Sequence, residues 1–359
     1  MSKLFKQFQM REVTFRNRLW VSPMCQYSSI DGMPNDWHMV HLGSRAVGGA
    51  GAVFVEATAV SPEGRISPQD SGIWSQVHAD GFAPIVRFIK AQGSIPGIQI
   101  AHAGRKASTA PPWLGGKRID PVDGGWEVVA PSPIAFSDDY PLPTAMNDAD
   151  FEKVLADFVA AARYAVAAGF EVIELHAAHG YLLHEFLSPL TNHRTDKYGG
   201  NLAARMSFPL KVAEEVRNAV PANLPFFVRI SASDWADGGW DLPQSIEFSR
   251  SLKAIGIDLI DCSSGGAVAD AVIPAAPNYQ VHFAETIRRE AQIATAAVGM
   301  ITEPKQAEDI LRMNQADAIM IARQFLREPY LGFRAAAELG DTIEVANQYR
   351  RAIDLGQGK

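Results

Sequence analysis

The sequence predicts a (β/α)8 TIM barrel, formed by one domain over residues 1–359. Three observations predict this fold: short apolar runs alternate with helical segments, eight such runs can be counted, and no Gly-x-Gly-x-x-Gly follows the first run. Short apolar strands that alternate with helices indicate a parallel sheet covered on both faces. Eight strands in one domain of this length favour a closed barrel, and the absence of the glycine motif counts against a Rossmann domain.

The expected elements follow one another in a regular order. Strands are expected at residues 19–21, 51–56, 95–100, 170–173, 224–230, 257–261, 293–298 and 316–321. Helices are expected near residues 80–92, 151–168, 203–219, 242–254, 283–290 and 304–313. The helix at 151–168 carries apolar residues at helical spacing, and Gly169 follows it as a C-cap.

Three segments fall outside this alternation. Residues 4–15 are expected to form a short N-terminal hairpin lid. Residues 107–143 are rich in Pro, Gly and Trp and show no clear period, which is typical of a functional lid or an added subdomain. We therefore expect a capping excursion there and a C-terminal tail at residues 340–359.

Composition excludes several classes of protein. A formal charge of −7 without a basic stripe makes nucleic acid an unexpected partner. No apolar run approaches the roughly 20 residues of a membrane helix, and the start lacks the apolar core of a signal peptide, so a cytoplasmic protein with no membrane partner is predicted. The two cysteines, Cys25 and Cys262, cannot form a disulfide framework or hold an iron–sulfur cluster.

Polar residues gather where the fourth strand ends. His176, His179 and Tyr181 lie within six residues of each other, and their side chains can donate and accept hydrogen bonds. The carboxyl ends of barrel strands are where chemistry usually takes place. Taken alone, the two imidazoles are also compatible with hydrogen-bonded core histidines.

Other strand ends suggest a phosphate site. Gly299 and Arg323 follow the seventh and eighth strands, where many barrels bind phosphate through loop N–H groups. A turn glycine and a surface arginine are the plain alternatives. Gln99 and Arg229 lie within expected strands, where their burial is costly without polar partners.

A flavin fits these four residues. Its pyrimidine ring needs donors such as Gln99 and Arg229, and its phosphate needs the end of the barrel at Gly299 and Arg323. A positive charge from Arg229 also stabilises the anionic reduced ring. The alternative for this arginine is a buried ion pair with Glu56 or Asp261.

Five motifs run in order along nearly the whole chain. They are Pro23–Tyr27 (PMCQY), Gln99–Lys106 (QIAHAGRK), His176–Leu182 (HAAHGYL), Arg194–Gly200 (RTDKYGG) and Ala322–Leu326 (ARQFL). Together they resemble the old yellow enzyme family of FMN-dependent ene-reductases. Cys25 with Tyr27 and the His-x-x-His pair is similar to the bacterial thermophilic-like branch of that family.

The resemblance implies FMN as the cofactor, NADPH or NADH as the reductant, and no metal site. It also implies that Cys25 replaces a threonine near the flavin and tunes its potential, whereas a small buried hydrophobe is the alternative from composition alone. The residues implied to contact FMN are Ser22, Pro23, Met24, Cys25, Ala59, Gln99, Arg229, Gly299 and Arg323.

The resemblance further implies the reaction. NAD(P)H reduces the flavin and leaves, and hydride then passes from flavin N5 to the β-carbon of a small-molecule enone or nitroalkene in a ping-pong cycle. His176 and His179 bind the carbonyl or nitro oxygen, Tyr27 lines the substrate site, and Tyr181 or water protonates the α-carbon.

The same branch of the family supplies an arginine from the tail of a neighbouring subunit. Gln348–Arg351 resembles that tail motif, so Arg351 is expected to reach the partner's active site in a homodimer or a dimer-based homotetramer. Arg350 leaves the register open, and a solvated tail is the alternative. Ala297 departs from the xenobiotic reductase A type, which has a tryptophan there, so substrate range does not transfer.

Three competing hypotheses remain. A metal-dependent hydrolase barrel would take its zinc ligands from His102, His176, His179 and His184, but it leaves Gln99 and Arg229 unexplained. A dienoyl-CoA reductase shares the barrel but needs an iron–sulfur cluster. A non-catalytic barrel would show no turnover with NAD(P)H.

Overall fold

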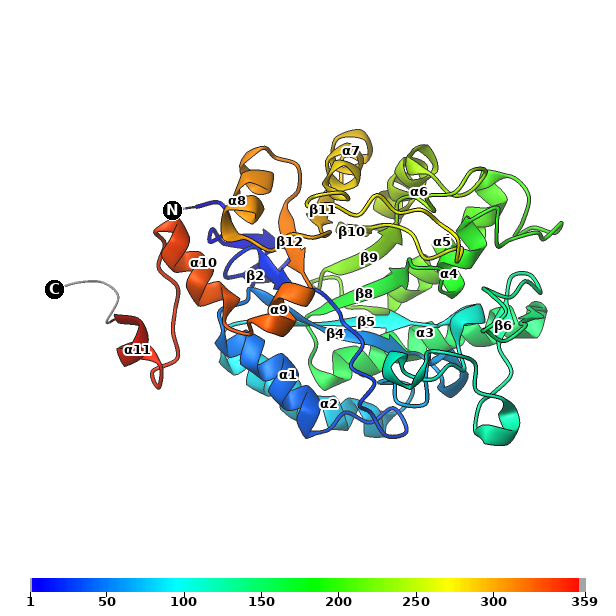
Figure 1. Ribbon diagram of the computed structural model, residues 1–359, viewed down its shortest axis with the longest axis horizontal. Helices are drawn as coiled ribbons and strands as arrows, with labels where there is room; N and C mark the ends of the chain where they lie inside the picture. The colour runs from blue at the N-terminus through cyan, green and yellow to red at the C-terminus, as the bar shows by residue number, and fades with distance from the viewer. Residues whose placement is uncertain (1, 355–359) are drawn as a thin grey trace.

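The computed structural model describes residues 2–354 and shows a closed parallel barrel surrounded by helices (Figure 1). Because β12 pairs with β3, the sheet has no open edge. The predicted (β/α)8 barrel is therefore confirmed. The eight barrel strands of the described chain are, in order, β3 (Leu19–Val21), β4 (Ala52–Ala59), β5 (Ile95–Ala101), β8 (Val172–Ala177), β9 (Phe226–Ser231), β10 (Leu259–Ser263), β11 (Ala294–Ala297) and β12 (Ala318–Ile321).

Helices cover the outside of the barrel. The longer ones are α1 (Asp36–Val47), α2 (Gln76–Ala91), α3 (Asp148–Ala168), α5 (Leu202–Ala219), α6 (Leu242–Ile255), α7 (Val281–Ala291), α8 (Pro304–Arg312) and α10 (Leu331–Leu339). Short helices are α4 (Leu182–Leu187), α9 (Arg323–Arg327) and α11 (Arg350–Asp354). The sequence analysis did not predict α1, although Asn35 and His38 form a capping box at its start. Gly169 ends α3 in the left-handed conformation, as expected.

The N-terminal hairpin closes one end of the barrel. Its strands, β1 (Phe8–Met10) and β2 (Val13–Phe15), pack on the apolar residues with which the barrel strands begin. The rings of Phe15 and Trp20 lie 4.5 Å apart between centroids. The hairpin therefore covers the amino ends of the strands and leaves their carboxyl ends to the longer loops.

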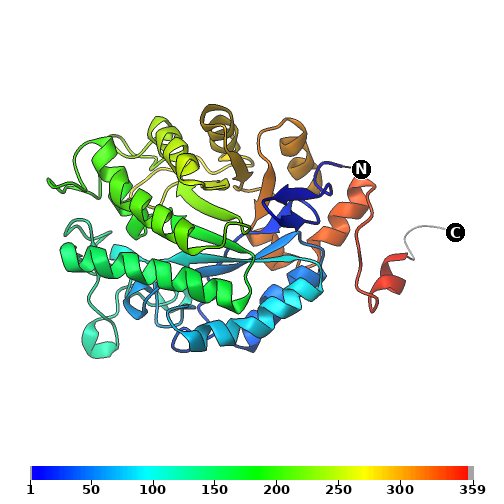
Figure 2. The same ribbon diagram turned by 180° about the vertical axis from the view of Figure 1, so that it is seen from behind.

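Two segments extend from the barrel. The excursion between β5 and α3 contains the two-residue strands β6 (Val129–Ala130) and β7 (Thr144–Ala145), and the Trp126 indole N–H within it donates to Glu63 O at 2.8 Å. Figures 1 and 2 both show α11 standing away from the barrel. Among the described helices, none is at once long and apolar enough to cross a membrane. The division into one domain with an excursion and a tail stays a prediction.

Candidate active site

Along three neighbouring strands, the side chains that point into the barrel change from apolar to charged over a distance of two residues. Side chains alternate across a strand, so residues two apart point into the same interior. At the amino end, β8, β9 and β10 contribute Val172, Phe227 and Leu259 to the apolar cluster under the hairpin. Two residues further on, the same strands place Glu174, Arg229 and Asp261 inside the barrel, all of them buried. Another two residues on are His176, Ser231 and Ser263, at the end where the loops begin.

The middle layer is a network of buried polar groups. Gln99, on β5, donates from Nε2 to Glu174 Oε1 at 2.7 Å. Arg229 donates from Nη1 to Ser22 Oγ at 2.9 Å, and its Nε lies 3.3 Å from Asp261 Oδ2. Asp261 is thus one of the two ion-pair partners considered for this arginine. The other, Glu56, instead accepts from Gln26 N at 2.5 Å and from Ser71 Oγ at 2.6 Å.

Two carboxyl groups compete for one arginine in this layer. Burial raises the pKa of Glu174, and the negative charge of Asp261 raises it further against the opposing effect of Arg229. Burial also raises the pKa of Asp261. Among residues 2–354, Glu174 Oε2 and both carboxylate oxygens of Asp261 have no hydrogen-bond partner. Such orphaned acceptors, beside the donors Gln99 and Arg229, suit the edge of a polar heteroaromatic ring.

A cavity of about 260 Å³ lies next to Arg229 at the carboxyl ends of β11 and β12. Gly299 and Arg323 both line it, so three of the sequence-predicted residues meet there. Gly299 has φ 126°, and a Cβ on it would lie 2.9 Å from Gln280 Nε2, so only glycine fits without a shift. Arginine side chains such as Arg323 and Arg327, together with backbone N–H groups of a loop, are the kinds of group that bind phosphate in proteins.

Two imidazoles meet edge to face at the carboxyl end of β8. His176 Nδ1 accepts from Ala178 N at 3.2 Å, so the neutral ring carries its proton on Nε2. His179 Nε2 lies 2.7 Å from Ser263 Oγ, and the two histidine rings are 5.1 Å apart between centroids. Desolvation and the charge of Arg229 lower the pKa of both histidines well below the usual range. They are therefore uncharged at neutral pH.

Tyr181 completes this cluster. Its ring meets the His176 ring edge to face, with 4.9 Å between centroids. Desolvation raises the pKa of Tyr181 well above its ordinary value, as do the nearby Cys25 and Tyr27. The phenol therefore keeps its proton at neutral pH, which is what a proton donor requires.

The loop after β3 brings two further predicted residues to this side. Desolvation raises the pKa of the Cys25 thiol, and the negative charges of Asp70 and Glu56 raise it further. A thiol that keeps its proton is a poor nucleophile. Tyr27 adopts a left-handed conformation, φ 48°, and its ring lies 5.6 Å from that of Trp113 in the excursion. The excursion thus contributes to the wall beside Tyr27.

Comparison with known proteins decides the family. The sequence profile of the NADH:flavin oxidoreductase / NADH oxidase family matches residues 3–342. The chain belongs to this family. The NADPH dehydrogenases of Bacillus velezensis and Bacillus subtilis are 48% and 47% identical to it, over 98% and 97% of this chain and 99% and 98% of their own. This confirms the resemblance to the old yellow enzymes.

Solved structures agree with this assignment. Morphinone reductase is 25% identical, with a TM-score of 0.79 over 96% of this chain and 91% of its own. An old yellow enzyme homologue from Zymomonas mobilis is 25% identical, with a TM-score of 0.78 over 96% of this chain and 95% of its own. As a flavin oxidoreductase of this family, the protein is an enzyme that uses FMN and a nicotinamide reductant. The donors, the orphaned acceptors and the arginine-lined cavity described above fit FMN.

In this flavin oxidoreductase, the remaining predicted residues fall in two places. Ser22, Pro23 and Met24 follow β3 directly, and Ala59 ends β4. Arg351 instead lies exposed in α11, away from the barrel. The structure thus gathers the predicted FMN contacts at the carboxyl end of the barrel but does not bring Arg351 to the site of its own chain.

Sequence reasoning missed two charged residues of the site. Glu174 was given no role because the strand was expected to end at residue 173, whereas β8 runs to Ala177. Lys106 ends the Gln99–Lys106 motif but was assigned no role. It donates from Nζ to His179 O at 2.8 Å and to Gly266 O at 2.6 Å, and burial lowers its pKa to about 7.

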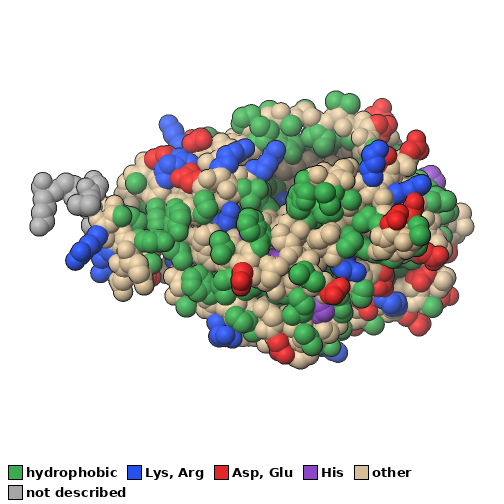
Figure 3. Space-filling model, turned by 60° about the horizontal axis from the view of Figure 1, so that its bottom comes forward, with side chains coloured by type: hydrophobic (Ala, Val, Ile, Leu, Met, Phe, Trp, Pro, Cys, Tyr) green, Lys and Arg blue, Asp and Glu red, His purple; other side chains and the backbone are tan. Residues whose placement is uncertain are grey.

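The metal-hydrolase hypothesis took its zinc ligands from four histidines. Two of these, His102 and His184, have protein partners instead. His102 Nδ1 accepts from Gly104 N at 3.1 Å, and His184 lies against Asp234. Within residues 2–354, no group of three or more His, Cys, Asp or Glu could hold a metal ion. On the face drawn in Figure 3, basic and acidic side chains are interspersed, without a continuous positive stripe.

Proposed function

We propose that this flavin oxidoreductase reduces activated C=C bonds of α,β-unsaturated carbonyl or nitro compounds, with NADPH or NADH as the electron donor in a ping-pong cycle. The observation that carries the proposal is the cluster of His176, His179 and Tyr181 at the carboxyl end of β8: two uncharged imidazoles beside a phenol that keeps its proton. Bound FMN supplies the hydride that reaches the β-carbon.

The residues proposed to hold FMN lie around one end of the barrel. Gln99 and Arg229 meet the pyrimidine edge, and Arg229 offsets the negative charge of the reduced ring. Gly299 and Arg323 hold the phosphate. Ser22 orients Arg229 through its hydroxyl group. Pro23, Met24, Cys25 and Ala59 line the remaining wall, and the Cys25 thiol modulates the reduction potential.

The substrate is polarised by the histidines. His176 accepts a hydrogen bond from Ala178 N at its Nδ1. Its Nε2–H can therefore donate to a carbonyl or nitro oxygen. His179 supplies the second contact, which withdraws electron density from the alkene and favours hydride addition at the β-carbon. Tyr181 or water then protonates the α-carbon, and Tyr27 lines the substrate space.

We further propose a cytoplasmic homodimer, or a homotetramer built from such dimers. The projecting α11 supports this, because an exposed Arg351 that lies away from its own barrel is free to meet a neighbouring chain. Arg350 is the other candidate in this helix. Sedimentation of the full chain and of a chain that ends at residue 340 tests the assembly. The same number of subunits per particle in both would contradict a role for the tail.

A visible absorption spectrum of the purified protein is the first test. We expect two flavin bands that bleach on anaerobic addition of NADPH and return on addition of 2-cyclohexen-1-one. Bleaching without return on enone or nitroalkene would leave the flavin oxidoreductase but remove the proposed substrate class.

A further inference from the structure

The turn that carries the catalytic cluster has a conformation that needs external support. His179 and Gly180 are both left-handed, with φ 59° and 71°, and the first of them is not glycine. A Cβ on Gly180 would lie 2.0 Å from Gly266 O, so the turn is pressed against the loop after β10. An L-residue leaves the left-handed region unless its surroundings hold it there.

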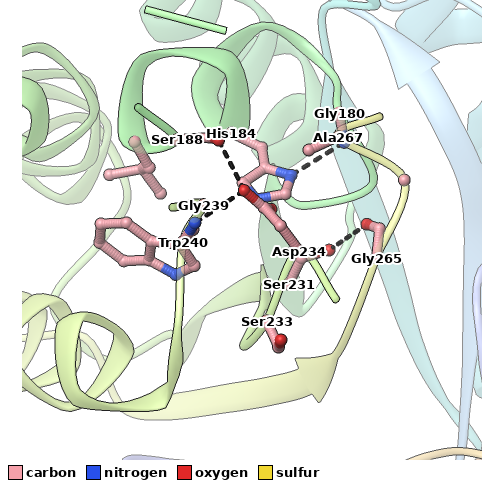
Figure 4. Close-up of polar contacts among 12 residues, drawn as sticks. Gly180, His184, Ser188, Ser231, Ser233, Asp234, Gly239, Trp240, Gly265 and Ala267 are labelled. Atoms are coloured by element: carbon pink, nitrogen blue, oxygen red, sulfur yellow. Dashed lines mark hydrogen bonds and ion pairs between the residues drawn. The ribbon is translucent and has the colours of Figure 1, made fainter. Parts of the chain in front are cut away.

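One contact of this turn comes from a buried pair of residues outside the cluster. Gly180 N donates to His184 Nδ1 at 2.9 Å, and His184 Nε2 lies 3.0 Å from Asp234 Oδ1 (Figure 4). Because Nδ1 accepts a hydrogen bond, the neutral ring carries its proton on Nε2, which faces the carboxylate. Both side chains are fully buried, at 0% exposure. The Gly180 N–H thus sets the tautomer of the imidazole, and the Asp234 carboxylate faces its Nε2 as a close charged neighbour without forming a well-aligned hydrogen bond.

Asp234 is itself held firmly. Its Oδ2 accepts from Ser188 Oγ at 2.5 Å and from Trp240 N at 2.8 Å, and its backbone N–H donates to Trp240 O at 2.8 Å. Ser188 follows α4, whereas Asp234 belongs to the loop after β9. The pair therefore connects the loop after β8, which carries the catalytic cluster, to a carboxylate anchored on the next loop around the barrel.

We propose that the His184–Asp234 pair is the positioning device of the active site, which holds the backbone of Gly180 and so aims His179 and Tyr181 at the substrate. The inference rests on the proposed enone reduction for its kinetic readout only. The hydrogen bonds of the pair go to Gly180, Ser188 and Trp240, so its link to His179 and Tyr181 runs through the turn. A shift of about 1 Å in such groups lowers a rate on the order of a hundredfold.

Asp234→Asn is the sharpest variant because it keeps the shape of the side chain and removes the charge that faces His184. We expect the protein to retain FMN and to be reduced by NADPH at the normal rate, while its reoxidation by 2-cyclohexen-1-one slows about ten- to a hundredfold. The effect should shrink in a Tyr181→Phe background, because the two changes act on the same step. If Asp234→Asn slowed reoxidation by the same factor in the Tyr181→Phe background as in the wild type, the proposal would be contradicted.

A second readout is independent of substrate. Amide hydrogen exchange of the peptide that contains Gly180 should accelerate in Asp234→Asn, since the acceptor of its N–H is no longer fixed. If the wild-type enzyme retains FMN but reduces no enone, the proposed function fails while this exchange still tests the positioning. Unchanged exchange in a folded variant would overturn the inference. If Asp234→Asn does not fold, the milder Ser188→Ala removes one anchor of the carboxylate and takes the same two measurements.

Asp258→Asn is the matched control. This carboxylate accepts from Phe226 N at 2.9 Å and from Arg11 Nε at 2.8 Å at the amino end of the barrel, far from the cluster. The Asp258→Asn variant should have a lower midpoint of unfolding. It should not change the rate of either half-reaction or the amide hydrogen exchange of Gly180. A selective loss of reoxidation in Asp258→Asn as well would show that the effect of Asp234→Asn reflects stability, and would overturn the proposal.

Discussion

The two ends of the barrel are built from the same strands with opposite chemistry. At the amino end, Trp20, Phe54 and Phe227 of the barrel strands pack with Phe15 of the hairpin, and the contacting rings have centroids 4.5 to 6.4 Å apart. Two residues further along β9, the interior side chain is Arg229. Burial of apolar side chains stabilises the amino end. At the carboxyl end, burial of charged side chains costs desolvation free energy that apolar packing does not offset. The difference separates the part of the barrel that maintains the fold from the part that is kept for chemistry.

The largest effect on stability is expected at the amino end. Trp20→Ala empties a fully buried site and removes a hydrogen bond to Asn17 O, so we expect the free energy of unfolding to fall by about 3–5 kcal/mol. Chemical denaturation measures this change. The rate per bound flavin should stay the same, because no site group is touched. Trp37→Ala, at a tryptophan that is 54% exposed, is the control and should change stability little. Equal losses in both variants would contradict the comparison.

At the carboxyl end the expected effect is kinetic. Tyr181→Phe removes the proposed proton donor and keeps the ring, so reoxidation by an enone should slow on the order of a hundredfold. Anaerobic stopped-flow absorbance separates this step from flavin reduction by NADPH, which should not change, and stability should be nearly unaltered. An equal loss in both half-reactions would show that Tyr181 has another role.

Buried carboxyl groups at the carboxyl end should make stability depend on pH. Burial raises the pKa of Glu185 from 4.5 to about 8, against the opposing charge of Arg105. The folded state therefore binds a proton that the unfolded state releases, so this group stabilises below pH 4.5 and its contribution is lost as pH rises to 8. The slope is at most about 1.4 kcal/mol per pH unit.

Glu185→Gln should flatten this decline. Denaturation curves at pH 5, 6.5 and 8 measure it, with Asp258→Asn at the amino end as the reference, since that carboxylate is ion-paired with Arg11. A decline in Glu185→Gln as steep as in the wild type would assign the proton to another group.

The contrast between the two ends also explains what the sequence could predict. The barrel and its strands follow from local apolar periodicity. Gln99, Arg229 and Arg323 stood out as polar residues in or after buried strands, and Gly299 stood out as a glycine at a strand end. Which partners they meet depends on the register between strands, which the sequence of one strand does not contain. Glu174 beside Gln99 is an example. Glu56 could not have been placed either, because its orientation depends on the irregularity between Val55 and Ala57 in β4.

The smallest expected effect compares the two cysteines of the chain. Cys25 lies beside the proposed flavin site, whereas Cys262 points from β10 into the core between barrel and helices, with 0% exposure. Because the thiol of Cys25 stays protonated, Cys25→Ala removes only a polarisable group. We expect FMN to remain bound and its midpoint potential to shift by tens of millivolts, where about 30 mV corresponds to ~1.4 kcal/mol for a two-electron couple. Cys262→Ala, of equal chemistry, should leave the potential unchanged. Loss of FMN from Cys25→Ala would make this residue a binding group instead of a modulator, and equal shifts in both variants would trace the potential to general packing.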